Sequence, residues 1–191
     1  MLDLLPLLIF SLAAFAFRAA ILLVAMALDW LVGEPDILWR RIPHPVVIMG
    51  RAISWFDRRW NRRVGMTGRG RRTRGGVAIF LLILVAVSLG VLLSFGGAIT
   101  AGIILAVMLA ARSLDEHIRA VAVALDDGVE PARHAVGMIV GRDTSHLSEA
   151  EIARAAIETG AENLSDGVIA PAFWFLVAGL PGLFVYKLVN T

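Results

Sequence analysis

Three long apolar runs, separated by polar stretches, dominate the sequence. Residues 4–28 are uncharged except for Arg18, residues 75–111 contain no charged side chain, and residues 168–189 are charged only at Lys187. About twenty consecutive apolar residues are enough to cross the hydrocarbon core of a bilayer. Each run is therefore long enough to form at least one membrane helix.

The middle run is too long for one ordinary span. The Gly96-Gly97 pair offers a break, so we predict a tight hairpin of two helices, 77–95 and 98–111. The pattern as a whole predicts an all-α, polytopic helical membrane protein with about four transmembrane helices.

Two of the runs contain features that a simple membrane helix lacks. A charge at the bilayer centre is costly, so we expect the first helix to cross the membrane with residues 19–32, and Arg18 to snorkel to the near interface. Gly179 and Pro181 interrupt the last run. Such an interruption is typical of a membrane helix that is kinked or lines a cavity.

The segment between the hairpin and the last run predicts a small helical subdomain. Ser148 and Glu151 form an S-x-x-E capping box that starts a helix. Its inner face is expected at Ile152, Ala155, Ala156 and Thr159. Before it, apolar residues recur at spacings of four, three and four, and are expected to continue the third span out of the membrane as far as Asp127-Gly128. These residues are Leu114, Ile118, Val121 and Leu125.

These elements divide the chain into five parts. They are an N-terminal extension with the first membrane helix (1–32), a Pro/Arg-rich loop (33–76), the transmembrane hairpin (77–111), the helical subdomain (112–167) and the fourth membrane helix (168–191). A hairpin returns the chain to the side it left, so the loop and the subdomain share one side. Arginine-rich loops stay in the cytoplasm. We therefore predict a multi-pass protein of the cell membrane, with the arginine-rich loop and the acidic subdomain cytoplasmic.

Charge is distributed unevenly although the net charge is only +2. Basic residues gather in 40–74 and acidic residues in 115–166, and this opposite sign predicts that the two regions associate. The arginine run lacks interleaved aromatic residues and a nucleic-acid-binding fold, so we expect contact with anionic lipid and none with nucleic acid. The absence of cysteine excludes disulfides and thiol chemistry. Lys187 is the sole lysine, and no phosphate loop with a G-K-[ST] ending is present.

An acidic stripe precedes the last apolar run. Glu158, Glu162 and Asp166 are spaced four apart, which places them on one face if the segment is helical. Such a stripe, opening onto a membrane segment, suits a metal-bound anionic substrate. The alternative is a solvated helix face.

Four stretches, taken together, resemble the CobD or CbiB family, the adenosylcobinamide-phosphate synthases of cobalamin biosynthesis. They are D-x-x-x-G-E-P with H-P-V-x-x-x-G-R (29–51), R-S-L (112–114), I-V-G-R-D-T (139–144) and E-x-x-A-E-N-x-x-D-G-x-I-A-P (158–171), running on into Y-K-x-x-N-T. Family members are longer, so this chain looks like an N-terminal portion. Its first fifteen or so residues look like an addition.

The resemblance implies an amide-forming step that joins adenosylcobyric acid to aminopropanol phosphate, or a related amino alcohol, with ATP and Mg²⁺. Carboxylates suit Mg²⁺, and we expect its ligands among Glu158, Glu162, Asp166 and Asp143, although Asp143 could instead orient the neighbouring Arg142. Planar guanidinium groups suit phosphate, for which Arg51, Arg112 and Arg142 are available.

Three further roles complete the expected site. Glu162 or His44 is expected as the base that deprotonates the amine, and Glu158 belongs to the same catalytic end of the site. Asn163 either binds a corrin amide or phosphate, or caps the end of its helix. His117, His134 and His146 are assigned to surface structure.

Two other classes compete with the enzyme. One is a non-enzymatic membrane regulator or sensor of the same superfamily, or an inactive fragment; the other is a small transporter, which would need more charged residues within its spans. The G-R-D-T and A-E-N-x-x-D-G residues favour the enzyme. A homo-oligomer or other proteins of the cobalamin pathway are the expected protein partners.

Overall fold

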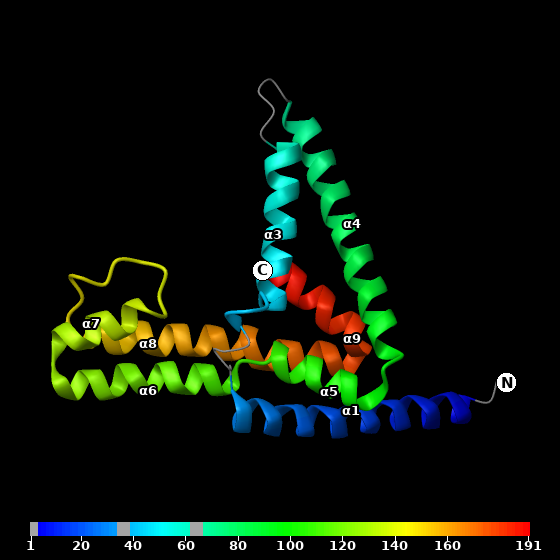
Figure 1. The fold of residues 1–191 in the computed structure, drawn as a ribbon, viewed down its shortest axis with the longest axis horizontal. Helices are drawn as coiled ribbons and strands as arrows, with labels where there is room; N and C mark the ends of the chain where they lie inside the picture. Colours follow the sequence, from blue (N-terminus) through cyan, green and yellow to red (C-terminus); the bar gives the residue numbers. More distant parts are fainter. Residues whose placement is uncertain (1–3, 34–38, 62–66) are drawn as a thin grey trace.

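The computed structural model describes residues 4–33, 39–61 and 67–191, and all its secondary structure in these ranges is helical (Figure 1). The elements are α1 (Leu4–Val32), α3 (Pro45–Phe56), the π-helical turn η1 (Asp57–Asn61), α4 (Gly68–Ser94), α5 (Gly97–Met108), α6 (Ala111–Asp127), α7 (Val129–Gly137), α8 (Glu149–Leu164), the π-helical turn η2 (Ser165–Ile169) and α9 (Ala170–Asn190). The predicted all-α fold is confirmed.

Four helical stretches in the described part of the chain are long and apolar enough to span a membrane, as predicted. They are Ser11–Val32, Gly68–Ser94, Gly97–Asp127 and Glu149–Asn190. The last two join neighbouring elements, α5 with α6 and α8 through η2 with α9.

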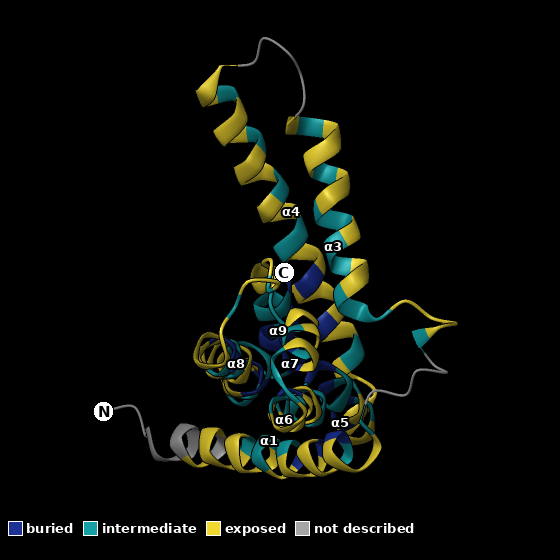
Figure 2. Cartoon of the chain, turned by 90° about the vertical axis from the view of Figure 1, so that its left-hand side faces the viewer, coloured by how far each residue is buried: buried dark blue, intermediate teal, exposed yellow. Residues whose placement is uncertain are grey.

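The helices form three parts (Figures 1 and 2). A bundle contains α1, α5, α9 and the C-terminal half of α4, and a subdomain contains α6, α7 and α8. The third part, which we call the arm, contains α3, η1 and the N-terminal half of α4, and it rises from the bundle beside the subdomain. The bundle and the subdomain each have a buried apolar cluster of their own.

Close approach of α4 to α9 holds the bundle together. Gly90 of α4 lies against the backbone of Pro181, where an added Cβ would be only 2.5 Å from the proline Cα. Ala25 of α1 and Leu105 of α5 are fully buried in the same cluster. Small residues at such crossings let helices pack closely in lipid, where van der Waals contact replaces the hydrophobic driving force.

The subdomain is built as its sequence predicts. Glu151 accepts hydrogen bonds from the backbone N–H and the hydroxyl of Ser148, at 2.8 and 2.7 Å, which is the expected start of α8. The predicted inner residues Ile152, Ala155 and Ala156 are buried against Val121 of α6 and Val136 of α7. Thr159, the fourth predicted inner residue, is half-buried.

The hairpin turn coincides with the predicted glycine pair, with Phe95 and Gly96 between α4 and α5. The third span, however, does not continue unbroken to Asp127. It breaks at Leu109 and Ala110, whose backbones leave the helical region before α6 begins. A carboxylate from α1 stabilises the new helix start, as described below.

The fourth span breaks at Gly179, as the sequence indicated, where φ is 64° and ψ is −151°. The Arg18 guanidinium donates to the carbonyls of Leu176 and Val177, at 3.0 and 2.7 Å, next to this break. The Arg18 guanidinium thus has acceptors beside the broken helix, and its expected position at the near interface stays a prediction. A cavity of about 470 Å³ borders the break.

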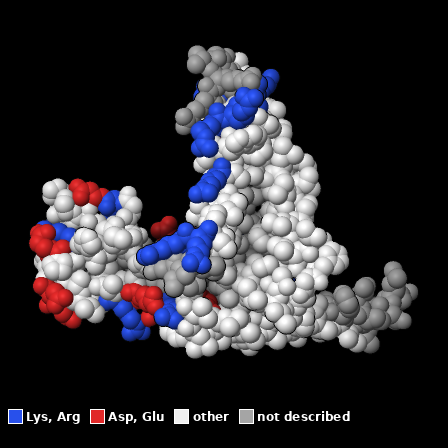
Figure 3. All heavy atoms as spheres, viewed as in Figure 1, with Lys and Arg blue, Asp and Glu red and all other residues white. Residues whose placement is uncertain are grey.

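The arm and the subdomain do not associate in this structure. Basic side chains follow one edge of the arm and acidic side chains gather on the subdomain, with open space between the two (Figure 3). No packing contact joins α3, η1 or α4 to the subdomain helices among the element pairs with substantial contacts. The predicted association is thus not realised within the described residues.

Candidate functional site

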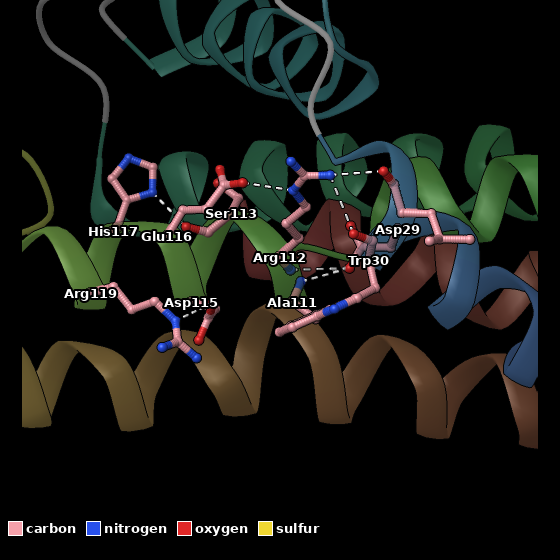
Figure 4. Close-up of polar contacts among 10 residues, drawn as sticks. Asp29, Trp30, Ala111, Arg112, Ser113, Asp115, Glu116, His117 and Arg119 are labelled. Atoms are coloured by element: carbon pink, nitrogen blue, oxygen red, sulfur yellow. Dashed lines mark hydrogen bonds and ion pairs between the residues drawn. The ribbon is translucent and has the colours of Figure 1, made fainter.

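Asp29, near the end of α1, caps the start of α6 (Figure 4). Its carboxylate accepts hydrogen bonds from the backbone N–H groups of Ala111 and Arg112, at 2.9 and 3.4 Å, and the residue is only 4% exposed. The first N–H groups of a helix have no partner within it, and a carboxylate there also meets the positive end of the helix dipole. The first residue of D-x-x-x-G-E-P thus fixes the junction between α5 and α6.

Arg112 in turn caps the end of α1. Its guanidinium donates to the carbonyls of Trp30 and Leu31, at 3.3 and 2.8 Å, at the end of α1, and to Glu116 at 2.6 Å. Gly33 closes α1 with φ of +64°, and an added Cβ there would be 2.8 Å from Arg112 Cδ. Arg112, predicted to bind phosphate, is occupied by this reciprocal capping.

We expect Asp29→Ala to lower the free energy of unfolding by about 1–2 kcal/mol, because it removes a buried cap and leaves two N–H groups without their acceptor. Asp115→Ala removes an acid on α6 whose one ion-pair partner among the described residues is the exposed Arg119; it is the matched control and should change stability by less than about 0.5 kcal/mol. Thermal unfolding in detergent measures both. Equal effects of the two changes would contradict the capping role.

His44 is held by both of its ring nitrogens. Nδ1 accepts a hydrogen bond from the Val46 backbone N–H at 3.2 Å, so Nε2 carries the hydrogen and donates to the Val107 carbonyl at 3.1 Å. The ring also contacts Trp39 edge to face. Because both ring nitrogens are engaged in hydrogen bonds, the structure supports a structural role for His44 over the expected role as a base.

A cleft of about 290 Å³ lies where the subdomain meets the bundle. Residues from three of the four motif stretches line it. They are Ser113 and Leu114 of R-S-L, Ile139 of I-V-G-R-D-T, and Asn163 and Gly167 of the A-E-N-x-x-D-G stretch, together with Ala110, His117 and Met138. Sequence segments up to about fifty residues apart thus converge on one concave surface.

Asn163, near the end of α8, lines this cleft. The alternative role that the sequence left open, capping the end of α8, is wrong, because α8 continues through η2 into α9 without a break. The amide of Asn163 therefore remains available to a ligand in the cleft.

His117 is a cleft residue that the sequence assigned to surface structure. Its Nδ1 lies 2.6 Å from the carbonyl oxygen of Ser113, one turn earlier on α6 (Figure 4). A carbonyl only accepts, so Nδ1 carries the hydrogen, and Nε2 has no hydrogen-bond partner among the described residues. The signal in the sequence was its position one helical turn after the serine of R-S-L.

None of the three acidic-stripe residues is among those that line this cleft. Gly160 faces α6, since an added Cβ would be 3.2 Å from Ile118. Glu158 and Glu162 are each two residues from Gly160, hence about 200° away around the helix, and both are exposed. Asp166 lies in η2, half-buried, where its backbone carbonyl accepts a hydrogen bond from Tyr186.

The described residues contain no group of three or more His, Asp or Glu side chains that could hold a metal ion. Glu158, Glu162, Asp166 and Asp143 therefore do not form a ready-made metal cage. Mg²⁺ usually takes only one or two carboxylates, with water and substrate phosphate completing its shell. The metal assignment of these residues stays a prediction.

The I-V-G-R-D-T stretch forms a loop between α7 and α8. Thr144 ties it down by donating to the Arg133 carbonyl at 2.9 Å. The Asp143 carboxylate accepts from the Ser145 N–H at 3.0 Å, and this hydrogen bond holds the pKa of the Asp143 carboxyl below its ordinary value. Arg142 is exposed and has no hydrogen bond or ion pair among the described residues.

The predicted phosphate-binding arginines lie in three separate places. Arg51 is on the exposed face of α3 in the arm, Arg112 is at the junction of α1 and α6, and Arg142 is in the loop before α8. The structure does not bring them together as one phosphate site. Glu34 and Pro35 of the first motif stretch, and Arg62 and Arg63 of the arginine run, lie outside the described residues.

Comparison with known proteins gives one family. Residues 22–191 match the family model described as CobD/Cbib protein. Among similar proteins, the cobalamin biosynthesis protein CobD of Brucella anthropi is 49% identical over 182 residues, covering 91% of this chain and 55% of the relative. The protein of the same name from Rhodobacter capsulatus is 44% identical over 180 residues, covering 91% of this chain and 56% of the relative.

This chain therefore spans about half the length of the curated relatives it matches. No solved structure matches it.

Proposed function

The chain belongs to the CobD/Cbib protein family, and from this premise we propose that it provides part of an enzyme of cobalamin biosynthesis. The proposed reaction joins adenosylcobyric acid to aminopropanol phosphate, or a related amino alcohol phosphate, to give adenosylcobinamide phosphate. We further propose that the protein lies in the cell membrane with its subdomain in the cytoplasm, where ATP and both substrates are available.

The observation that supports this proposal is the cleft between the subdomain and the bundle. Three of the four family stretches contribute to its lining, and it offers a histidine, a serine and an amide: His117, Ser113 and Asn163. A concave site with a few convergent polar groups is the usual form of a small-molecule site. A scaffold without chemistry would not require these polar residues to meet.

The chemistry requires activation of a carboxylate and deprotonation of an amine. A phosphoryl group from ATP converts the propionate carboxylate of adenosylcobyric acid into an acyl phosphate, releasing ADP. The amine of aminopropanol phosphate attacks the acyl carbon, so the C–N bond forms, the C–O bond to phosphate breaks and inorganic phosphate leaves. The amine gives up a proton to a base.

We assign His117 as this base, because its Nε2 has no hydrogen-bond partner among the described residues and the residue lines the cleft. Asn163 is assigned to hydrogen bonding with a substrate amide or phosphate beside it. Arg142 remains a candidate donor to phosphate, since its guanidinium is exposed and has no hydrogen bond or ion pair among the described residues.

Glu158 and Glu162 are the candidates to hold Mg²⁺. They lie one turn apart on one exposed face of α8, and neither has a hydrogen bond or ion pair among the described residues. This donor set fits Mg²⁺ chemically, since two carboxylates leave room for water and phosphate oxygens. When bound, the ion would neutralise charge on the transferred phosphoryl group.

Product formation tests the proposal. The chain, continued to the length of its relatives and reconstituted in lipid, should form amide product from adenosylcobyric acid, aminopropanol phosphate and ATP. Glu162→Gln should abolish this product while membrane insertion stays intact. No product from the unaltered protein would favour the regulatory or sensor alternative, and normal product from the Glu162 variant would remove that residue from the site.

A further inference from the structure

The arm contains a groove that the proposed reaction does not use. It lies between α3 with η1 on one side and α4 on the other, and has a volume of about 450 Å³. Its lining changes in character along α4, from Arg71 and Arg74 to Ile79 and Leu82. These residues follow one helical stripe, so one face of α4 forms this wall.

The cationic end of the groove is unpartnered. Neither the Arg71 nor the Arg74 guanidinium has a hydrogen bond or ion pair among the described residues. Asp57, the one acid among the lining residues, accepts a hydrogen bond from Asn61 at 2.8 Å. Two arginines against one carboxylate leave this end of the groove positive.

The other end of the groove is apolar and lies along the membrane-span candidate of α4. Phe56 of α3 and Leu188 of α9 line it with Leu82, and α4 has no charged residue after Arg74. From Arg71 to Leu82 the helix rises by about 16 Å. That distance matches the change from the headgroup level of a bilayer to its upper acyl chains.

We propose that this groove binds one anionic phospholipid, with its phosphate at Arg71 and Arg74 and an acyl chain along Ile79 and Leu82. A pocket that is cationic at one end and apolar at the other complements an anionic amphiphile. Guanidinium groups are suited to phosphate oxygens, and burying the chain removes exposed apolar surface of α4 from contact with mobile lipid or water. The site is independent of the proposed reaction.

Lipid binding to the purified 191-residue chain in detergent tests this site. Native mass spectrometry should show tighter binding of the first phosphatidylglycerol than of phosphatidylcholine with the same acyl chains. Arg71→Gln with Arg74→Gln should weaken phosphatidylglycerol binding about thirty-fold, the effect expected for two arginines at a membrane surface. Arg69→Gln with Arg72→Gln is the matched control, since it removes the same charge from the same turn of α4 outside the groove.

Four further results would each overturn or support the lipid site. Equal weakening by the two double variants, or equal binding of the two lipids by the unaltered chain, would overturn it. Inorganic phosphate that displaces phosphatidylglycerol at equal concentration would show a phosphate site without a place for the chain, and would also overturn it. Ala78→Phe, which fills the groove without changing its charge, should weaken phosphatidylglycerol binding while the helical circular dichroism is unchanged.

Discussion

Replacing Gly90 by leucine is expected to lower the free energy of unfolding by about 3 kcal/mol, and so the melting temperature by roughly 6–12 °C. An added Cβ at Gly90 would lie 2.5 Å from Pro181 Cα and 2.6 Å from its nitrogen. These are backbone atoms that cannot rotate away, so α4 and α9 must move apart. Their contact is the most extensive between any two described elements.

Gly76→Leu is the control for this change, because it makes the same substitution in the same helix. No atom outside the helix lies within 4 Å of an added Cβ at Gly76, so the leucine enters open space. The free energy of unfolding of this variant should change by less than about 1 kcal/mol. Any change should be an increase, since leucine favours a helix more than glycine does. Similar losses in the two variants would show that α4 and α9 do not pack as described.

The sequence predicted the helical fold because the signals that define these helices are local: each depends only on residues that are close together in the chain. The capping box at Ser148 and Glu151 and the buried face of α8 at Ile152, Ala155 and Ala156 need only neighbouring residues to be recognised. The glycine pair at the hairpin is another local signal. These features were therefore predicted at the correct positions.

The break between α5 and α6 was missed because its cause is remote. The acceptor that caps α6 is Asp29, 82 residues before Ala111 in the chain. Arg112 was assigned to phosphate for the same reason, since nothing near it in sequence indicates that the end of α1 supplies its acceptors. Contacts of this kind depend on how helices pack, which periodicity does not specify.

The candidate site was predicted in part. The motif stretches around Ser113, Ile139 and Asn163 were recognised, and the structure brings them to one cleft. Glu158 and Glu162 belong to one of these stretches but do not line the cleft, because Glu162 is rotated around α8 by about 100° from Asn163, and Glu158, five residues earlier, by about 140°. Residues of one motif are close in sequence, but on a helix their side chains point in different directions, so they need not reach the same site.

His117→Asn is expected to lower kcat for amide formation by a factor of about 10² to 10⁴, the usual contribution of a positioned general base. The asparagine amide can still donate to the Ser113 carbonyl, as Nδ1 of the histidine does at 2.6 Å, so the local structure of α6 is retained. What is lost is the lone pair of Nε2. The measurement is the rate of product formation in the chain at the length of its relatives.

Two controls separate this role from a structural one. His134→Asn changes an exposed histidine of α7 that does not line the cleft, and should leave kcat within about two-fold. Added imidazole should restore part of the activity of His117→Ala, because a free base can enter the space that the side chain leaves, whereas it should not restore Glu162→Gln. If His117→Asn retains full activity, the amine gives its proton to another group and the base assignment of His117 is wrong.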